Sequence, residues 1–181
     1  MRLFTAIQLP APLREQLADV QLALRVLSST PASWTAPDNL HVTLQFLGEV
    51  QEADVPELLS ALRRVAVEPF TLTVAALGTL PSRGPASVIT AELSGQTDAL
   101  EQLVNAIQLA TRPLGFTPEH RTYHAHVTLA RLRSPRDLKR ELDAYPLRPL
   151  PSFPVAEFVL IRSTLGASGS RYQALARFAL K

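Results

Sequence analysis

The chain has 181 residues, of which 46% are hydrophobic and 19% are charged, and its formal net charge is +2. These proportions are typical of a globular protein and exclude wholesale disorder or a fibrous structure, while the small net charge argues against tight binding along an extended nucleic-acid duplex. Because cysteine is absent, disulfides, thiolate metal sites and cysteine nucleophiles are excluded.

The first half of the chain alternates strand and helix patterns. Residues 2–9 form an apolar strand candidate, and residues 10–27 carry leucine and valine at helical spacing. A loop rich in serine and proline over 28–39 leads to an expected strand over 40–47. A helix is expected next, at about 53–67.

The second half repeats this alternation. The expected elements, in chain order, are strands over 70–77 and 86–93, a helix over 97–111, a loop over 113–122, a strand over 124–132, a helix over 134–144 with Ser134 as its cap, and strands over 155–163 and 172–180. Short helices between strands that do not form a strict run of crossovers predict an α+β fold with antiparallel sheets flanked by helices.

No apolar run reaches the roughly 20 residues of a membrane span, and the first residues lack a charged leader with a cleavage site. We therefore expect a cytoplasmic protein without a membrane partner, and no obligate protein partner is evident.

One tetrapeptide, His-Val-Thr-Leu, occurs twice, at residues 41–44 and 126–129. Such an internal repeat predicts a single domain over residues 1–181 that consists of two lobes, each with one HxTx motif. We expect the lobes to be related by a pseudo-twofold axis around a central cleft.

Strand geometry makes each tetrapeptide half core and half site. Side chains alternate faces along a strand, so His41 and Thr43 project to one side, as do His126 and Thr128. Two imidazoles with a pKa of about 6.5 can act as general base and general acid near neutral pH. The threonine hydroxyls can donate to phosphate oxygens, so that this chemistry requires no metal and no cofactor.

In this context the chain resembles the two-histidine (2H) phosphoesterases, and among them the bacterial RNA 2',3'-cyclic phosphodiesterases, also called 2'-5' RNA ligases. The resemblance extends over nearly the whole chain and rests on RLFTAIQLP at the start, WTAPDNLHVTLQFLGEV at 34–50, LGFTPEHRTYHAHVTLAR at 114–131, and the ending FVLIRSTLGASGSRYQALARFAL. It implies metal-independent hydrolysis of RNA 2',3'-cyclic phosphate ends to 2'-phosphate, with RNA 3' ends or small cyclic nucleotides as partners.

The resemblance also implies residue roles. His41 corresponds to the family's proton donor and His126 to its proton acceptor, while Thr43 and Thr128 bind the phosphate.

Two further positions match family residues but conflict with flat-strand geometry. Arg131 matches an arginine that contacts the phosphate, and Phe46 matches an aromatic residue near the nucleotide. Each lies five residues after its motif histidine, at a spacing that places it on the opposite face of a flat strand. For Phe46, packing in the core is an equally good interpretation.

Some positions depart from the family pattern. Ala36 replaces a basic residue that is common before the first motif, and Ala125 replaces a proline that often precedes the second. Arg83 or Arg121 could compensate for the first change in binding the RNA backbone. Basic residues also outnumber acidic ones over 121–148, which suits an anionic substrate or a solvated helix face.

Three alternatives to hydrolysis stay open. His120, His124 and His126 have a spacing compatible with a transition-metal site. The histidine pair could instead join RNA halves through a 2'-5' linkage, because ligation is the reverse reaction. The chain could also be a non-catalytic module that binds RNA ends.

Overall fold

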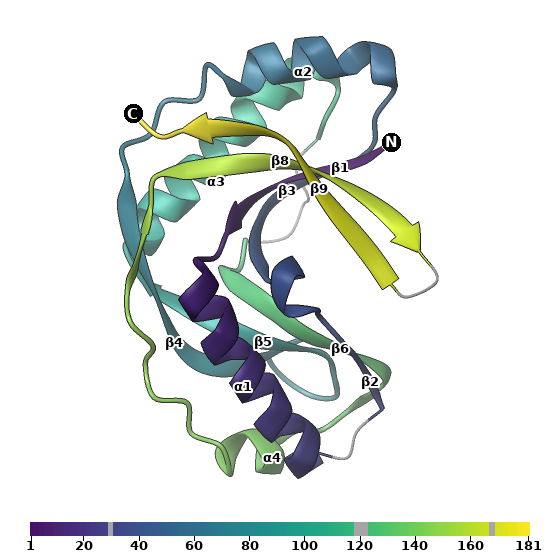
Figure 1. Ribbon diagram of the computed structural model, residues 1–181, viewed down its shortest axis with the longest axis vertical. Helices are drawn as coiled ribbons and strands as arrows, with labels where there is room; N and C mark the ends of the chain where they lie inside the picture. Colours follow the sequence, from purple (N-terminus) through teal and green to yellow (C-terminus); the bar gives the residue numbers. More distant parts are fainter. Residues whose placement is uncertain (29–30, 118–122, 167–168) are drawn as a thin grey trace.

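A computed structural model describes residues 1–28, 31–117, 123–166 and 169–181. In this part of the chain one antiparallel sheet of nine strands curves around the centre of the molecule, with helices packed on its outer side (Figure 1). The strands are β1 (Arg2–Gln8), β2 (Ala32–Trp34), β3 (His41–Glu49), β4 (Phe70–Leu80), β5 (Ala86–Gly95), β6 (His126–Arg136), β7 (Phe153–Val155), β8 (Glu157–Gly166) and β9 (Gly169–Ala179). The α-helices are α1 (Ala11–Ser28), α2 (Val55–Leu62), α3 (Thr97–Thr111) and α4 (Lys139–Asp143). The predicted α+β class with antiparallel strands is confirmed.

The strand order β7-β4-β5-β6-β3-β1-β8-β9, with β2 beside β6, divides the sheet into two halves. We call β3, β1, β8 and β9 the first half-sheet, and β6, β5, β4 and β7 the second. They meet where β3 and β6 pair, through the single register pair Val42 and Val127. The two copies of the tetrapeptide therefore lie side by side at the seam between the halves.

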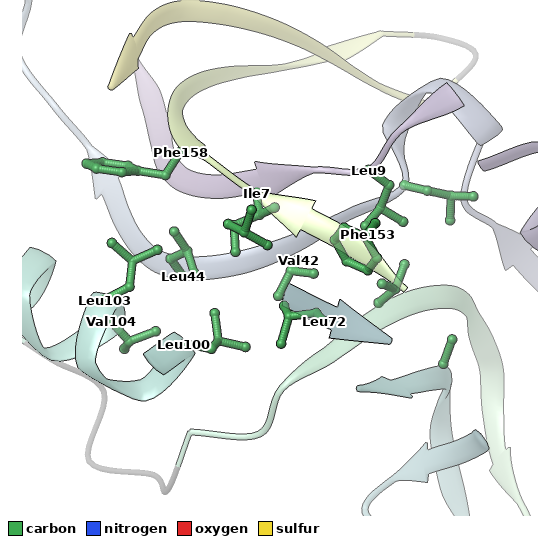
Figure 2. Packing of buried hydrophobic residues seen from close by; sticks show 14 of the residues in the cluster. Ile7, Leu9, Val42, Leu44, Leu72, Leu100, Leu103, Val104, Phe153 and Phe158 are labelled. Carbon is green, nitrogen blue, oxygen red and sulfur yellow. The ribbon is translucent and has the colours of Figure 1, made fainter. Parts of the chain in front are cut away.

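Each long helix packs against the half-sheet that it does not directly follow. Helix α3, which follows β5, buries Leu100, Leu103 and Val104, and Figure 2 shows these side chains close to Leu44 of β3. Helix α1, which follows β1, donates from Gln21 to the carbonyl of Leu129 in β6 at 2.8 Å. One continuous cluster of buried apolar residues connects both halves behind the seam. Each half-sheet is therefore covered in part by a helix that directly follows a strand of the other half, and loss of either helix would expose apolar surface there.

Most predicted elements are present, and the helix over 97–111 has the expected bounds. The loop over 28–39 was only partly right, because it contains β2, which pairs with β6. The helix expected over 53–67 is shorter: a 3-10 turn over Glu52–Asp54 precedes it, and α2 extends only from Val55 to Leu62.

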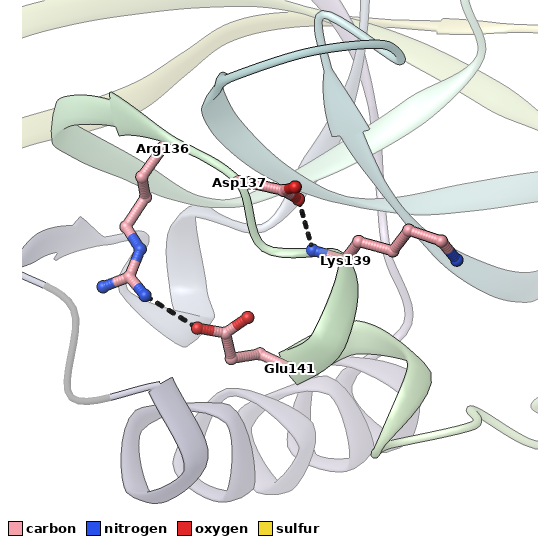
Figure 3. A network of polar contacts seen from close by, with 4 residues as sticks. All are labelled: Arg136, Asp137, Lys139 and Glu141. Atoms are coloured by element: carbon pink, nitrogen blue, oxygen red, sulfur yellow. Dashed lines mark hydrogen bonds and ion pairs between the residues drawn. The ribbon is translucent and has the colours of Figure 1, made fainter.

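The helix predicted over 134–144 was wrong in its first half. Ser134 belongs to β6, whose register continues to Arg136 opposite Ala86, so it caps no helix. The N-cap of α4 is Leu138, and the carboxylate of Asp137 just before it accepts the backbone N–H of Lys139 at 2.9 Å (Figure 3). Pairing with β5, a contact far away in sequence, overrides the local helical pattern.

The predicted strand over 155–163 consists of two strands, β7 and β8, which pair with different neighbours. Among the helices in the described ranges, none combines the length and the apolar character needed to cross a membrane.

Candidate active site

The seam between the half-sheets brings the two predicted histidines together. Val42 and Val127 face the core and are fully buried, whereas His41 and His126 lie half-buried on the other face. Thr43 and Thr128 share that face. The face assignment that the sequence predicts for both tetrapeptides is therefore what the structure shows.

A β-bulge follows each motif threonine. It changes the face of the sheet on which the following side chains lie. In β3 the register with β1 shifts between Thr43 and Gln45, and in β6 the register with β5 shifts between Thr128 and Ala130. The extra residue is the final leucine of the tetrapeptide in both strands. Beyond an unpaired residue, the side chains of the strand lie on the opposite faces from those that simple alternation predicts.

These bulges remove the conflict over Phe46 and Arg131. Both side chains are exposed, and both line the same cleft as His126. The flat-strand expectation that placed them opposite the histidines was wrong, and so was the packing of Phe46 in the core, since it is 53% exposed.

A backbone carbonyl two residues earlier orients each imidazole. The distance from Nδ1 of His41 to the carbonyl oxygen of Asn39 is 2.6 Å, and that from Nδ1 of His126 to the carbonyl of His124 is 2.7 Å. A carbonyl can only accept, so Nδ1 must carry the proton in both rings. The nitrogen left for proton transfer is then Nε2 in both residues.

The surroundings of the two rings differ. His41 packs against Phe4 and Tyr172, with ring centroids 5.0 and 5.4 Å away, and its Nε2 lies 3.0 Å from Oγ1 of Thr43. His126 has no such aromatic contacts among the described residues and lines the cleft directly. The first imidazole is therefore held more tightly than the second.

Burial lowers the pKa of both imidazoles below the ordinary 6.5. At His41, the positive charges of His126 and Arg131 lower the pKa further, while its backbone hydrogen bond opposes the shift. At His126, Arg131 also lowers the pKa, but the backbone hydrogen bond and the carboxylate of Glu92 oppose the shift. Without a bound anion, both rings are consequently neutral near pH 7.

The cleft in front of the seam has a volume of about 870 Å³. Thr43, Thr128 and His126 line its floor, together with Phe46 from β3 and Arg131 from β6. His41 contributes instead to a small pocket of about 40 Å³ behind its ring, and reaches the cleft side through its contact with Thr43. Hydroxyls, imidazoles and a guanidinium around one cavity can bind and protonate a phosphate group.

Three residues that support the site were not predicted. Tyr123 donates from its hydroxyl to the carbonyl of Thr43 at 2.9 Å, and thereby connects the segment before β6 to the bulge in β3. Gln21 satisfies the carbonyl at the equivalent bulge in β6. Asn39 donates from its side chain to the carbonyl of Ser170 in β9 at 2.8 Å. Only long-range contacts reveal these roles, and no local sequence signal marks them.

The alternative metal site would require His120 in addition to His124 and His126. Within the described ranges, no three histidine or acidic side chains lie close enough to hold a metal ion, and His124 is exposed at the cleft. His120 and Arg121 lie outside the described residues. Arg83 is exposed in the turn between β4 and β5.

Two of the basic residues in the segment 121–148 are balanced locally by carboxylates. Arg136 forms an ion pair with Glu141 at 2.8 Å (Figure 3), and Lys139 pairs with Asp143 at 2.7 Å. These exposed pairs match the solvated-face interpretation of this segment. Arg131 is different, because it lines the cleft and no acidic group among the described residues lies within ion-pair distance.

Known proteins share this sequence and this architecture. The family model for LigT-like phosphoesterases matches residues 7–90 and 92–172. The RNA 2',3'-cyclic phosphodiesterase of Escherichia coli K12 is 35% identical over 183 residues, covering 99% of this chain and 96% of that protein, and the one of Archaeoglobus fulgidus is 28% identical over 98% and 99%. The crystal structure of E. coli LigT complexed with 3'-AMP superimposes with a TM-score of 0.78 at 33% identity, covering 99% of this chain and 97% of that chain. A crystal structure of a Thermus thermophilus protein gives a TM-score of 0.81 at 28% identity, covering 99% and 98%.

Proposed function

The chain belongs to the LigT-like phosphoesterase family, and we propose that it hydrolyses 2',3'-cyclic phosphates at RNA 3' ends to 2'-phosphates. The observation that carries this proposal is the pair of imidazoles at the seam, each oriented by a backbone carbonyl so that Nε2 is available. The names of its full-length relatives support the same activity.

We propose that His126 acts as the general base and His41 as the general acid. Nε2 of His126 takes a proton from water, whose oxygen attacks phosphorus; the bond between phosphorus and O3' breaks, and Nε2 of His41 protonates O3'. Two features support this assignment. Glu92 opposes the lowering of the pKa only at His126, which favours a base, whereas the deeper burial of His41 makes its cation a stronger acid.

The substrate itself supplies the charge that the acid needs. Both imidazoles have a lowered pKa in the free protein, but a phosphodiester anion between them favours the protonated form. Thr43 and Thr128 would donate to the non-bridging oxygens, where negative charge increases in the transition state. Arg131 would contact the phosphate from the edge of the cleft, and Phe46 would face the nucleoside.

This mechanism needs no metal or other cofactor, and residues 1–181 would act as one domain of two lobes, each supplying one HxTx motif. The continuous core behind the seam supports this unity. The proposed partners are RNA 3' ends or small cyclic nucleotides, and the proposed location is the cytoplasm, which cell fractionation would test.

The decisive experiment is product analysis with a short RNA that ends in a 2',3'-cyclic phosphate, in the presence and absence of EDTA. We expect a 2'-phosphate at the same rate in both samples. Formation of a 3'-phosphate, or loss of activity with EDTA, would contradict the proposed mechanism.

The same assay separates the alternatives. A longer RNA formed after addition of an RNA with a 5'-hydroxyl end would indicate 2'-5' ligation. Binding of the 2'-phosphorylated product without any turnover would indicate a non-catalytic module.

A further inference from the structure

The second half-sheet presents an ordered row of side chains beyond the phosphate-binding threonine. Thr128 of β6 pairs in register with Thr90 of β5, and the next cleft-facing pair is Arg131 with Val88. Val88 in turn pairs with Leu80 of β4. Directly opposed residues of antiparallel strands have neighbouring side chains on one face. Leu80, Val88 and Arg131 thus form one row across three strands.

The apolar part of this row continues into the turn after β4. Leu80, Pro81 and Val88 all line the cleft, with Ser87 beside them. Pro81 is exposed, Leu80 is partly exposed, and Val88 is 9% exposed beneath them. We call Leu80, Pro81 and Val88 the cleft shelf. None of its side chains can donate to or accept from a phosphate, so acid-base chemistry does not account for it.

The cleft is large for a site that binds one small ligand. Pockets for single drug-sized ligands have volumes of about 300–1,000 Å³, and this cleft, at about 870 Å³, lies near the upper end. Phe46 lies on the first half-sheet, on the other side of the phosphate site from the shelf. The terminal nucleoside and the cleft shelf would therefore lie on opposite sides of the reacting phosphate.

The charges next to the shelf suit a polynucleotide. Arg131 adjoins it in the same row, and Arg83 is exposed in the turn that follows Pro81. Proteins that bind single-stranded nucleic acids combine positive charge along the backbone with side chains that contact the faces of the bases. Here the surface for such a contact is aliphatic, and the two arginines supply the charge.

We propose that the cleft shelf binds the base of the nucleotide on the 5' side of the cyclic phosphate, so that the preferred substrate is an RNA end of at least two nucleotides. This inference rests on the proposed function. Leu80 and Val88 would contact the face of the base, while Arg131, next to Val88 in the same row, would keep its contact with the reacting phosphate.

The test compares adenosine 2',3'-cyclic phosphate with the dinucleotide ApA that carries a 2',3'-cyclic phosphate. For the wild type we expect kcat/KM to be about tenfold higher for the dinucleotide, which corresponds to about 1.4 kcal/mol from burying one face of the second base against the cleft shelf. In Leu80→Ala, the ratio of the two kcat/KM values should fall toward one. The matched control is Leu165→Ala, since Leu165 is 78% exposed on β8 and does not line the cleft; its ratio should equal that of the wild type.

Each outcome decides between the proposals. Equal kcat/KM values for the two substrates in the wild type, or an unchanged ratio in Leu80→Ala, would overturn the proposed role of the cleft shelf. The proposed hydrolase activity would be unaffected. Absence of hydrolysis with both substrates would overturn the proposed function itself. Thermal unfolding of Leu80→Ala verifies that the variant is folded under the assay conditions.

Discussion

The two motif strands have the same four residues, the same bulge and the same carbonyl-bound imidazole, yet they give their histidines different surroundings. In β3 the ring of His41 is enclosed by Phe4 and Tyr172, while in β6 the ring of His126 borders the open cleft. A duplicated backbone can thus supply two identical side chains in different surroundings, because neighbouring strands determine the burial and the charge around each ring.

The largest expected effect comes from removing either imidazole. His41→Ala and His126→Ala should each lower kcat for cyclic-phosphate hydrolysis by about 10²–10⁴-fold, because each loses one proton-transfer step. The double variant should be little worse than the poorer single variant, since the residues act as a unit. Circular dichroism would verify that the fold is retained, and near wild-type activity in either single variant would contradict the pair mechanism.

A substrate with a good leaving group distinguishes the acid from the base. The nitrophenolate of bis(4-nitrophenyl) phosphate leaves without protonation, so this substrate should restore much of the relative activity of His41→Ala and none of that of His126→Ala. The opposite pattern would exchange the two roles.

A smaller effect is expected at the threonines. Thr43→Val and Thr128→Val keep the shape of the side chain but remove one donor to the phosphate, and should lower kcat by about 10²-fold. Thr43→Val should cost more than Thr128→Val, because Oγ1 of Thr43 also contacts Nε2 of His41. Equal losses in steady-state kinetics would show that this contact is unimportant for catalysis.

Titration by NMR compares the pKa values of the two imidazoles directly and does not depend on catalytic activity. NMR should give both a pKa below 6.5 in the free protein. Inorganic phosphate should raise both pKa values. Glu92→Gln should lower the pKa of His126 and leave that of His41 unchanged, whereas equal shifts at both rings would contradict a local role for this carboxylate.

The same titration predicts how stability depends on pH. Between the lowered native pKa and the unfolded value of 6.5, the unfolded chain binds protons that the native protein does not. The contribution of these groups to the free energy of unfolding is therefore fully present above pH 6.5 and is lost as the pH falls toward the native pKa values. Urea unfolding at a series of pH values, with His41→Ala as the comparison, would measure it.

The smallest effects concern the residues that support the bulges. Gln21→Met removes donors to the buried carbonyls of Thr35 and Leu129 and should reduce the free energy of unfolding by about 1–2 kcal/mol. Tyr123→Phe removes one donor to Thr43 and should cost about 1 kcal/mol, with Tyr145→Phe as a control far from the motif. Urea unfolding measures both, and a loss near zero would show that water replaces these donors.

The sequence by itself determined which side chains repeat at the start of the two motif strands and which face of the sheet they occupy. A strand that alternates polar and apolar residues can bury only one face, so Val42 and Val127 enter the core and His41 and His126 must face away from it. The resemblance of the motifs to a known family added the expectation of a phosphodiesterase activity.

Only the tertiary structure decided how the rest of the site is arranged. Each bulge follows from pairing with another strand, and it returns Phe46 and Arg131 to the face of the histidines, which no local pattern indicates. The side chains that donate hydrogen bonds to backbone carbonyls at the bulges, Gln21 and Tyr123, come from segments distant in the chain. Local propensity determines the type of an element, but long-range pairing determines its register, and in this protein the register places the outer residues of the site.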